Sequence, residues 1–442
     1  MRQLRLFCIG GCVAALIAWA IRLFVHTFAS PLATGEINPP PTTSSSAPTF
    51  VISRGGVYSG DWSSDDPAVP AVSIKTAQPV TIENSTIRGG GNLIATAVDH
   101  AKIILRNNHA VGVNPNAAGQ RPGRFFYGEK VDSVRIENND ISHTSGIELH
   151  SYSGDFQPDQ TIQILRNVAR NIDGRLSDGH NGWLDFNERT PLAGGKTEKG
   201  FDEVHFVILD NVRRLGGIEI AWNQVICDPG ESRVEDVINI YLSSGTHQSP
   251  ISIHDNYIQG AYTIRPWQAN TQDQNYKYDW QYNGGGILLG DGTPESSERA
   301  PAFVEAFANQ VVGTSNYGIA IAAGHDLAFH DNRIVSCGFL PDGRYIPSQN
   351  VGAYIWDTHH GARLSPPAFF NNSGRRNIVG WVSSPDKTKR NDWWHPDATH
   401  WDTNIPLPDP ITRATEEAEY KMWTEKLALM GVSIGAAKIG KR

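Results

Sequence analysis

Residues 134–152, VRIENNDISHTSGIELHSY, decide the fold. Apolar and polar residues alternate, the alternation breaks at two asparagines, and it then resumes, which is typical of two short β-strands joined by a turn. The polar side of the second alternation carries Glu148 and His150. These two side chains belong to a surface of stacked residues only if the stretch is one turn of a repeat rather than one strand of an ordinary sheet.

The same pattern recurs along much of the chain. Apolar alternation that ends in asparagine precedes Asn84, Asn107, Asn138, Asn167, Asn211, Asn256, Asn309 and Asn332. A second motif is found in GIEL (from 146), GIEI (217), INIYL (238), GGILL (285), GIAI (318) and GAYI (352). The spacings fit units of roughly 22 to 33 residues with insertions, which is the signature of a solenoid. We expect each coil to contain at least two short strands joined by an asparagine turn, because asparagine tolerates the left-handed backbone conformation and can bond its neighbours along a stack.

Through these asparagine turns and GIxL strands the chain resembles the right-handed parallel β-helix proteins of the pectate-lyase-like superfamily, over roughly residues 50–380. The resemblance implies an all-β chain folded as a single-stranded right-handed parallel β-helix, a solenoid with an N-terminal hydrophobic segment and a C-terminal cap of helix and loop. It also implies action on polysaccharides, because the superfamily consists mostly of lyases, hydrolases and epimerases, with some adhesins and tail spikes. The hallmark motifs of polygalacturonases and pectate lyases are absent, so the resemblance implies no particular activity.

The composition agrees with many short strands and argues against one class of partner. The 442 residues include 43 glycines, 26 prolines and only 3 methionines, which suits strands joined by turns. The net charge is −8, and no run of basic residues with interleaved aromatics is present, so we expect no nucleic-acid partner. We expect a monomer that acts on a polysaccharide.

Residues 1–30 have the pattern of a targeting segment. Arg2 and Arg5 precede LFCIGGCVAALIAWAI, and Arg22 then interrupts the apolar run. The run is slightly long for the ~7–15-residue core of a signal peptide and short for a membrane span of ~20 residues, so cleavage and retention as a membrane anchor both stay open. Either outcome predicts an extracytoplasmic protein that meets the membrane only through this segment.

The remaining boundaries follow from composition and from the repeat. Residues 31–49 are rich in proline, serine and threonine and are expected to form a linker, and residues 50–382 are expected to form the β-helix. Residues 383–442 are expected to wrap the open end of the solenoid and to finish in a helix within ITRATEEAEYKMWTEKLALMG. The apolar positions that we expect this helix to bury are Ala418, Met422, Leu427 and Leu429.

The cysteines provide no framework for the fold. Cys227 and Cys337 are the two outside the targeting segment, and the expected repeat places them several coils apart. We therefore expect both to be reduced and buried, and we find no spacing typical of a metal site.

Outward residues on successive coils of a parallel stack form ladders with a spacing of ~4.8 Å. We align the second strand of each coil as IELH (147–150), LDFN (184–187), IEIA (218–221), INIY (238–241) and IRPW (264–267). The alignment predicts one outward column formed by Glu148, Asp185, Glu219, Asn239 and Arg265. It predicts a second column formed by His150, Asn187, Ala221, Tyr241 and Trp267.

These columns predict a carbohydrate site in a carboxylate-lined groove. The expected catalytic residues are Glu148, Asp185, Glu219 and Arg265. The expected substrate-binding residues are His150, Asn239, Tyr241, Trp267 and Trp280, the last from an aromatic-rich stretch at 264–285.

The chemistry of such a site stays open at the level of sequence. Stacked carboxylates repel, so at least one should have a raised pKa or the column should hold a cation, with Ca²⁺ the only cofactor that we consider. Two carboxyl groups on adjacent coils would have the separation of ~5–5.5 Å that is found in retaining glycosidases. Two carboxyl groups on alternate coils would have the separation of ~6.5–9.5 Å that is found in inverting glycosidases. With a uronic-acid polymer, Arg265 could instead abstract a proton or pair with the substrate acid. The sequence therefore predicts a polysaccharide lyase or hydrolase, and the alternative is a non-catalytic glycan-binding or surface-structural β-helix protein.

Overall fold

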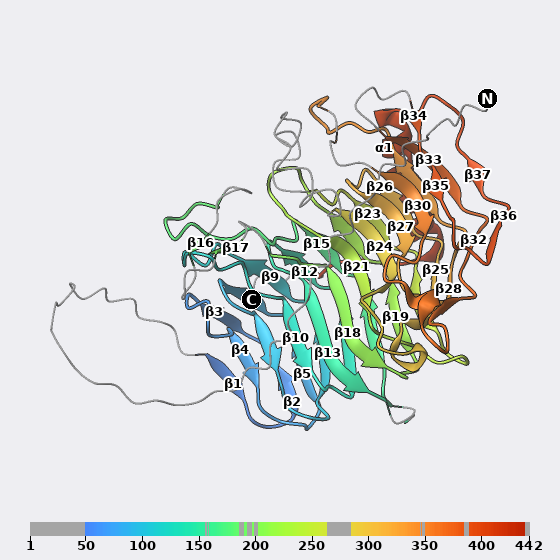
Figure 1. Cartoon of the computed structure of the whole chain (residues 1–442). Helices are drawn as coiled ribbons and strands as arrows, with labels where there is room; N and C mark the ends of the chain where they lie inside the picture. The colour runs from blue at the N-terminus through green and yellow to red at the C-terminus, as the bar shows by residue number, and fades with distance from the viewer. Residues whose placement is uncertain are drawn as a thin grey trace, which may run out of the picture. The chain divides into compact units, whose positions relative to one another are not determined.

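The computed structural model describes residues 49–154, 157, 159–184, 190–191, 197–198, 202–262, 284–344, 346, 350–383 and 389–437. This part of the chain forms a right-handed parallel β-helix, in which successive coils contribute strands to three long sheets, named sheets A, B and C (Figure 1). The fold implied by the resemblance is confirmed.

Sheet A carries the candidate site. In spatial order it consists of β1 (Phe50–Ile52), β4 (Val72–Ile74), β7 (Ile94–Thr96), β10 (Phe126–Glu129), β13 (Ile147–Ser153), β18 (Val207–Arg213), β21 (Asp236–Tyr241), β24 (Gly285–Asp291), β27 (Tyr317–Ile321), β30 (Val351–Ile355) and β35 (Trp393–Trp394).

Sheet B contains the strands that lead into the asparagine turns. They are β2 (Gly56–Tyr58), β5 (Val80–Glu83), β8 (Lys102–Arg106), β11 (Ser133–Glu137), β14 (Ile162–Leu165), β19 (Ile218–Ala221), β22 (Ile251–His254), β25 (Ala302–Phe307), β28 (Gly324–His330), β32 (Ser373–Arg375) and β36 (His400–Asp402), with β31 (Phe369–Phe370) beside β28.

Sheet C follows each asparagine turn. It consists of β3 (Asp61–Ser64), β6 (Thr86–Gly89), β9 (His109–Gly112), β12 (Asp140–Ser142), β15 (Val168–Arg170), β20 (Gln224–Ile226), β23 (Tyr257–Gln259), β26 (Gln310–Val312), β29 (Arg333–Ser336) and β33 (Ile378–Ser383), with β34 (Lys389–Arg390) and β37 (Ile405–Pro406) paired to β33. Outside these sheets, β16 (Thr190–Pro191) pairs with β17 (Thr197–Glu198), and 3-10 turns cover Ser297–Arg299 and Gly361–Arg363.

A ladder of buried asparagines closes the turn between sheets B and C. Its members are Asn108, Asn139, Asn167, Asn223, Asn256, Asn309, Asn332 and Asn377. Each side-chain amide donates to the side-chain oxygen of the next member, as Asn167 does to Asn223 at 2.9 Å, and to a backbone carbonyl of the coil before. The last member, Asn377, donates to the partly buried Asn404. The buried turn is thus satisfied without water, which explains why the motif recurs.

The sequence located this ladder only in part. Asn167, Asn256, Asn309 and Asn332 belong to it. Asn107 and Asn138 stand one residue before a member, and Asn84 stands before Ser85, whose backbone N–H donates to Asn108. The φ values of Asn84, Asn107 and Asn138 are 50°, 53° and 52°. Asn211 lies on β18 of sheet A, and the buried member of that coil is Asn223. The two segments of this coil were exchanged. FVILDN (206–211) belongs to sheet A but resembles the strands that precede the asparagine turns, whereas GIEI (217–220) belongs to sheet B but resembles the strands of sheet A.

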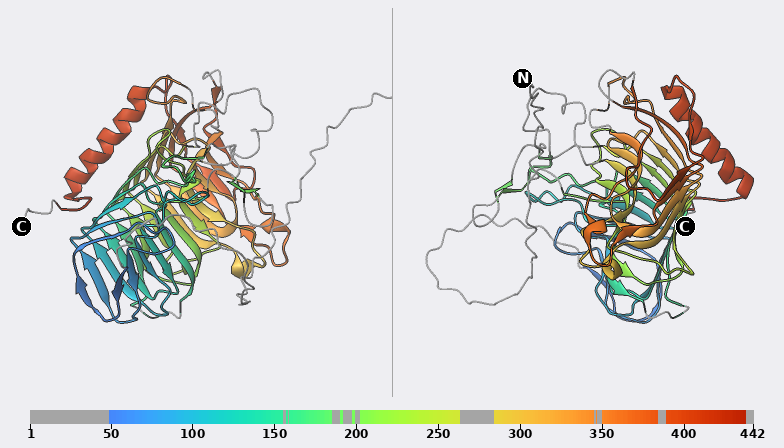
Figure 2. Two further views of the ribbon diagram at one scale, coloured as in Figure 1. Left: turned by 90° about the vertical axis from the view of Figure 1, so that its left-hand side faces the viewer. Right: turned by 45° about the vertical axis from the view of Figure 1, so that its right-hand side comes forward.

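The C-terminal part of the chain continues the β-helix further than expected. The segment after residue 382, which we expected to wrap the end, adds β35, β36 and β37 to the three sheets. Helix α1 (Arg413–Met430) then lies along sheet C and ends at Gly431, whose φ is 65° (Figure 2). The predicted helix is therefore present at the expected place.

The face that α1 buries differs from the expected one. Its buried side chains are Glu416, Glu419, Trp423 and Leu427. Met422 is 38% exposed, and Leu429 is 85% exposed. The expected apolar face is wrong except at Leu427, because buried glutamates pair with sheet C: Arg333 donates to both oxygens of Glu419 at 2.7 Å.

Two further expectations concern the cysteines and the N-terminal segment. Cys227 and Cys337 are buried and free, as predicted. The targeting segment at residues 1–30 lies outside the described residues. Among the residues that are described, no helix has the length and apolarity needed to cross a membrane.

Candidate functional site

Four of the predicted side chains come from neighbouring parts of sheet A. Glu148 and His150 lie on β13, and Asn239 and Tyr241 lie on β21, with β18 between the two strands. In register, Ile208 separates Glu148 from Asn239, and Asp210 separates His150 from Tyr241. Because side chains alternate across a strand, these residues all project from the outward face of the sheet.

Glu219 lies on a different sheet. It is part of β19 in sheet B, where it pairs with Gln163 and Ser252, and its Oε1 lies 3.2 Å from Nε2 of His254. Its alignment with Glu148 is therefore wrong. The segment IEIA resembles IELH in sequence, but it precedes the ladder asparagine Asn223 and so occupies the sheet B position of its coil.

The other predicted residues cannot be placed. Asp185, Arg265, Trp267 and Trp280 lie outside the residues that the structure describes.

Asp210 is a site residue that the sequence alignment missed. It lies directly beside His150 on the neighbouring strand and separates His150 from Tyr241, where we had placed Asn187 and Ala221. A signal for it was present: the stretch VILD (207–210) has the same alternation as IELH (147–150), and the register pairs Leu209 with Leu149.

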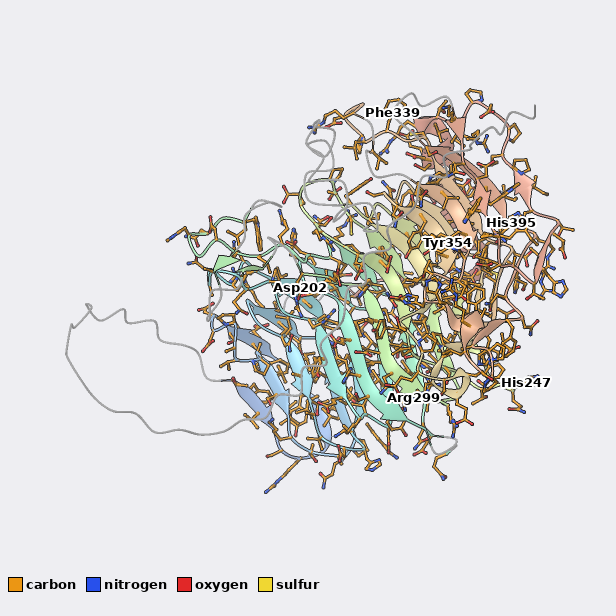
Figure 3. The ribbon with its side chains drawn as sticks, in the orientation of Figure 1. Asp202, His247, Arg299, Phe339, Tyr354 and His395 are labelled. Carbon is orange, nitrogen blue, oxygen red and sulfur yellow. The ribbon has the colours of Figure 1, made fainter. Side chains whose placement is uncertain are left out.

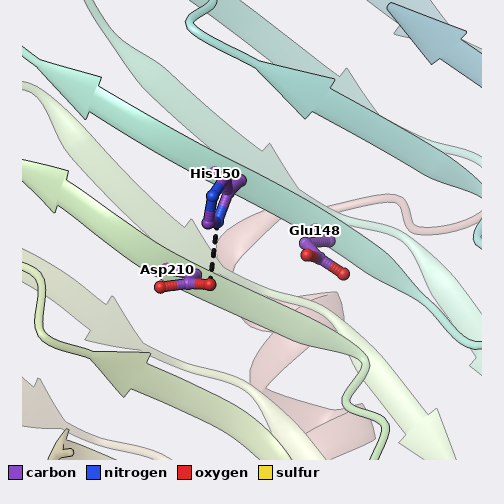
Figure 4. Close-up of side chains that lie close together, drawn as sticks. All are labelled: Glu148, His150 and Asp210. Carbon is purple, nitrogen blue, oxygen red and sulfur yellow. Dashed lines mark hydrogen bonds and ion pairs between the residues drawn. The ribbon is translucent and has the colours of Figure 1, made fainter. Parts of the chain in front are cut away.

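His150 and Asp210 form a hydrogen-bonded pair on the outward face. Nδ1 of His150 lies 2.8 Å from Oδ2 of Asp210, and both side chains are partly exposed (Figure 4). The hydrogen bond to Asp210 raises the pKa of His150 above its ordinary value, although partial burial opposes the shift. With Nδ1 directed at Asp210, Nε2 is the ring atom left for a ligand, and it carries a proton when the ring is charged.

Glu148 is held by a buried arginine. Nη2 of Arg124 lies 2.5 Å from Oε2 of Glu148, and Nη1 of Arg124 donates to the carbonyl of Ser145 at 2.8 Å. Burial and the nearby Arg121 lower the pKa of Arg124 to about 10, so this guanidinium is still charged at neutral pH. Arg124 and Glu148 therefore form an ion pair at the edge of the outward face.

Glu148, His150 and Asp210 together make one compact set. Each offers one ligand atom, and these atoms lie within 4.8 Å of one another. The spacing would admit a cation, but the fit to Ca²⁺ is poor, because Ca²⁺ prefers oxygen ligands and both carboxylates already have partners in Arg124 and His150. The arrangement suits proton transfer better than metal binding.

A second cluster of acidic residues lies on strands β21 and β24 of sheet A. Nδ2 of Asn239 donates to Oδ2 of Asp236 at 3.1 Å and to Oδ2 of Asp291 at 3.0 Å, so one amide holds two carboxyl groups. Asp236 is 3% exposed, and burial raises its pKa to about 7, even though the hydroxyl of Tyr317 donates to it. Burial acts in the same direction on Asp291, but hydrogen bonds from His359 and Asn239 outweigh it and lower the pKa of Asp291. The environment therefore shifts the pKa values of these two neighbouring carboxyl groups in opposite directions.

His205 and Glu235 adjoin this cluster. Nδ1 of His205 donates to the carbonyl of Asp236 at 2.9 Å, and its Nε2 lies 3.6 Å from Oε2 of Glu235. Burial lowers the pKa of His205 to about 3, so the ring is neutral, while burial and the neighbouring Asp236 raise the pKa of Glu235. The buried Arg233 opposes this rise in the pKa of Glu235. His205, Glu235 and Asp236 each offer one ligand atom, and these atoms lie within 4.8 Å of one another, so they form a second group that could hold a metal ion.

Aromatic side chains flank the acidic residues along sheet A. Tyr127 lies beside Glu148 in register, Tyr241 lies beside Asp210, and Tyr354 pairs with Trp394 towards the other end of the sheet. Such rings can support the apolar faces of sugars. The column of Tyr127, Glu148 and Asn239 runs along the axis of the β-helix, as a bound polymer could.

Comparison with known proteins assigns the chain to no family. No protein-family model matches the chain, and no curated protein matches its sequence. A search of solved structures finds the A-module of the mannuronan C-5 epimerase AlgE4 from Azotobacter vinelandii, with 12% sequence identity over 80% of this chain and 89% of that chain and a TM-score of 0.28. The description of the fold rests on strand pairing and not on this similarity.

Proposed function

We propose that the outward face of sheet A binds a polysaccharide and cleaves its glycosidic bonds by acid–base chemistry. One observation carries the proposal: His150, with a raised pKa, Asp210 and Glu148, which pairs with a buried arginine, form one compact group in which one ligand atom from each residue lies within 4.8 Å of the others. Cleavage of a glycosidic bond needs such a group, because the leaving oxygen must gain a proton while a base or nucleophile acts on the sugar ring.

The roles follow from the contacts. His150 in its charged form donates the proton on Nε2 to the glycosidic oxygen, and Asp210 orients the ring and stabilises its charge through Nδ1. Glu148 acts on the ring itself. In hydrolysis it attacks the anomeric carbon, or activates the water that does so. In elimination it removes the proton next to the carboxyl group of a uronic acid, and a double bond forms as the leaving oxygen departs with the proton from His150.

The other residues predicted for this site have different roles. Tyr241 adjoins Asp210, and its hydroxyl and ring can contact the sugar beside the cleaved bond. Asn239 is buried and fixes Asp236 and Asp291, so its role is to position these acids rather than to touch the polymer. Glu219 has no part in this site, because it belongs to sheet B.

We also propose that the protein acts outside the cytoplasm. The support is the sequence of residues 1–30, where two arginines precede an apolar run. Fusion of these residues to a reporter that is active only after export tests the point, and a reporter that stays in the cytoplasm overturns it.

The experiment that tests cleavage measures new reducing ends and the ultraviolet absorbance of unsaturated uronates. Neutral and uronic polysaccharides are incubated with the wild-type protein, His150→Gln, Glu148→Gln and Glu219→Gln, with and without Ca²⁺. We expect His150→Gln and Glu148→Gln to lose activity by ~10²-fold or more and Glu219→Gln to retain it. New reducing ends without absorbance identify a hydrolase, and reducing ends with absorbance identify a lyase. Binding of a polysaccharide without either product would replace the proposal with a non-catalytic glycan-binding protein.

A further inference from the structure

An arginine-lined cavity lies next to the His150–Asp210 pair. Its volume is about 300 Å³, and its lining residues are Ser151, Tyr152, Asn211, Arg213, Arg214, Glu298 and Arg299. Ser151 and Asn211 directly follow His150 and Asp210 in the chain, so the cavity begins where the proposed acid–base pair ends. In Figure 3, Arg299 lies near the arrowhead ends of the sheet A strands, and Asp202 lies near their beginnings.

Arg213 places a fixed positive charge at the wall of this cavity. It is 6% exposed and donates to the backbone carbonyls of Leu242 at 2.6 Å, Arg299 at 2.8 Å, Ala300 at 3.2 Å and Glu298. All of these acceptors are neutral. Burial, together with the charges of Arg299 and Arg214, lowers the pKa of Arg213 to about 10.

Arg214 and Arg299 keep their side chains exposed beside Arg213. Within the described residues, no ion pair joins any of these three arginines to a carboxylate, and Glu298 is the one acidic residue of the lining. The cavity therefore has an excess of positive charge in a protein whose net charge is −8. Planar guanidinium groups at such a concave surface bind carboxylate or sulfate oxygens in pairs.

A second arginine-lined cavity of the molecule has no comparable excess of positive charge. A second cavity, of about 310 Å³, is also lined by arginines, Arg106 and Arg166. There Glu83 lies 2.7 Å from Arg106, and Glu137 lies 2.5 Å from Arg166, so the charges cancel. The cavity beside His150 has no such pairing among the described residues.

We propose that the cavity at Arg213, Arg214 and Arg299 binds an oxyanion substituent of the polysaccharide, a carboxylate or a sulfate, and so selects an acidic polymer. The identity of the polymer rests on the proposed function, whereas anion binding by the cavity does not. A chain laid along the β-helix axis runs across the strands of sheet A, and its substituents then point towards the strand ends, where the cavity lies. A sugar whose linkage meets His150 would thus direct an acidic group to the arginines.

The test measures binding by calorimetry with the full-length protein. The probes are a uronate, a sulfated and a neutral oligosaccharide of equal length, at low and high salt. The variants are Arg214→Gln, Arg299→Gln and the double variant, with Arg88→Gln on the exposed face of β6 as the matched control. Arg213 is left unchanged because it anchors the backbone of residues 298–300.

We expect at least one acidic probe to bind about tenfold or more tightly than the neutral one, with affinity that falls at high salt. The double variant should lose this preference, Arg88→Gln should keep it, and the better acidic probe identifies the group. Equal binding of acidic and neutral probes, no binding of any probe, or an unchanged double variant overturns the proposal. Anion-dependent binding without cleavage of any polymer would refute only the proposed catalysis, and cleavage without acidic preference would refute only the cavity.

Discussion

His150 and Asp210 are 60 residues apart in the chain, yet Nδ1 of the histidine lies 2.8 Å from Oδ2 of the aspartate. The contact exists because β13 and β18 are neighbours in sheet A with Leu149 opposite Leu209. Burial of these two apolar side chains in the core fixes the register, and the register places the imidazole and the carboxylate on the same outward surface.

The pair predicts how activity depends on pH. Asp210 raises the pKa of His150, so the proton donor is present below this raised pKa and is lost as the pH rises through it. Asp210→Asn removes the carboxylate, and the alkaline limit of kcat should move to lower pH while the acid side changes less. The pH profile of the variant measures this shift. Asp331→Asn, which disrupts the similar His330–Asp331 pair on sheet B, should leave the profile unchanged, and a shift there would argue against a site on sheet A.

The buried acid Asp236 predicts a pH dependence of stability. Its pKa of about 7 in the folded protein lies above the ordinary value of 3.8, so the unfolded chain releases this proton at lower pH than the folded one. The free energy of unfolding should therefore fall as the pH rises from about 4 to about 7. In Asp236→Asn this contribution disappears, and denaturation across that range should show a smaller slope. The exposed Asp65→Asn is the control, and an equal slope in wild type and Asp236→Asn would contradict the assignment.

The asparagine ladder predicts a large difference between adjacent residues. Asn108 is fully buried and bonds to Asn139 and to the carbonyl of Ile82, so Asn108→Ala leaves buried polar groups without partners and should cost about 2–4 kcal/mol. Asn107→Ala should cost about 1 kcal/mol, because only its left-handed backbone conformation is disfavoured. Urea denaturation compares the two variants, and equal losses would show that the ladder does not stabilise the coil as the contacts indicate.

The docking of α1 predicts a further contrast. Trp423 is fully buried, packs against Tyr257 and donates from Nε1 to the carbonyl of Asp255 at 2.8 Å. Trp423→Ala should lower the free energy of unfolding by about 3–5 kcal/mol, and Leu429→Ala, at an 85% exposed position, by less than about 0.5 kcal/mol. Thermal and chemical denaturation measure both. A stable Trp423→Ala protein would mean that the helix contributes little to the β-helix.

The amino-acid sequence determined the architecture of this protein. Alternating apolar residues that end in asparagine, as in VRIEN and LAFHDN, predict the fold, because each coil repeats the same pattern of core residues and turn residues. The same reasoning located α1 and the buried cysteines, and it singled out Glu148, His150, Asn239 and Tyr241. These features depend on local pattern, which a sequence displays directly.

Only the tertiary structure decided which residues meet across coils. Strand register depends on the length of every insertion between coils and on which strand precedes a buried asparagine, so two stretches as similar as IELH and IEIA lie on different sheets. For this reason Asp210 lies beside His150, Glu219 lies on sheet B and not in the column of Glu148, and Glu419 of α1 pairs with Arg333 of sheet C. A segment that is assigned to the wrong strand of its coil is placed on the wrong sheet, and its side chains then belong to another surface of the molecule. The local sequence does not reveal this assignment.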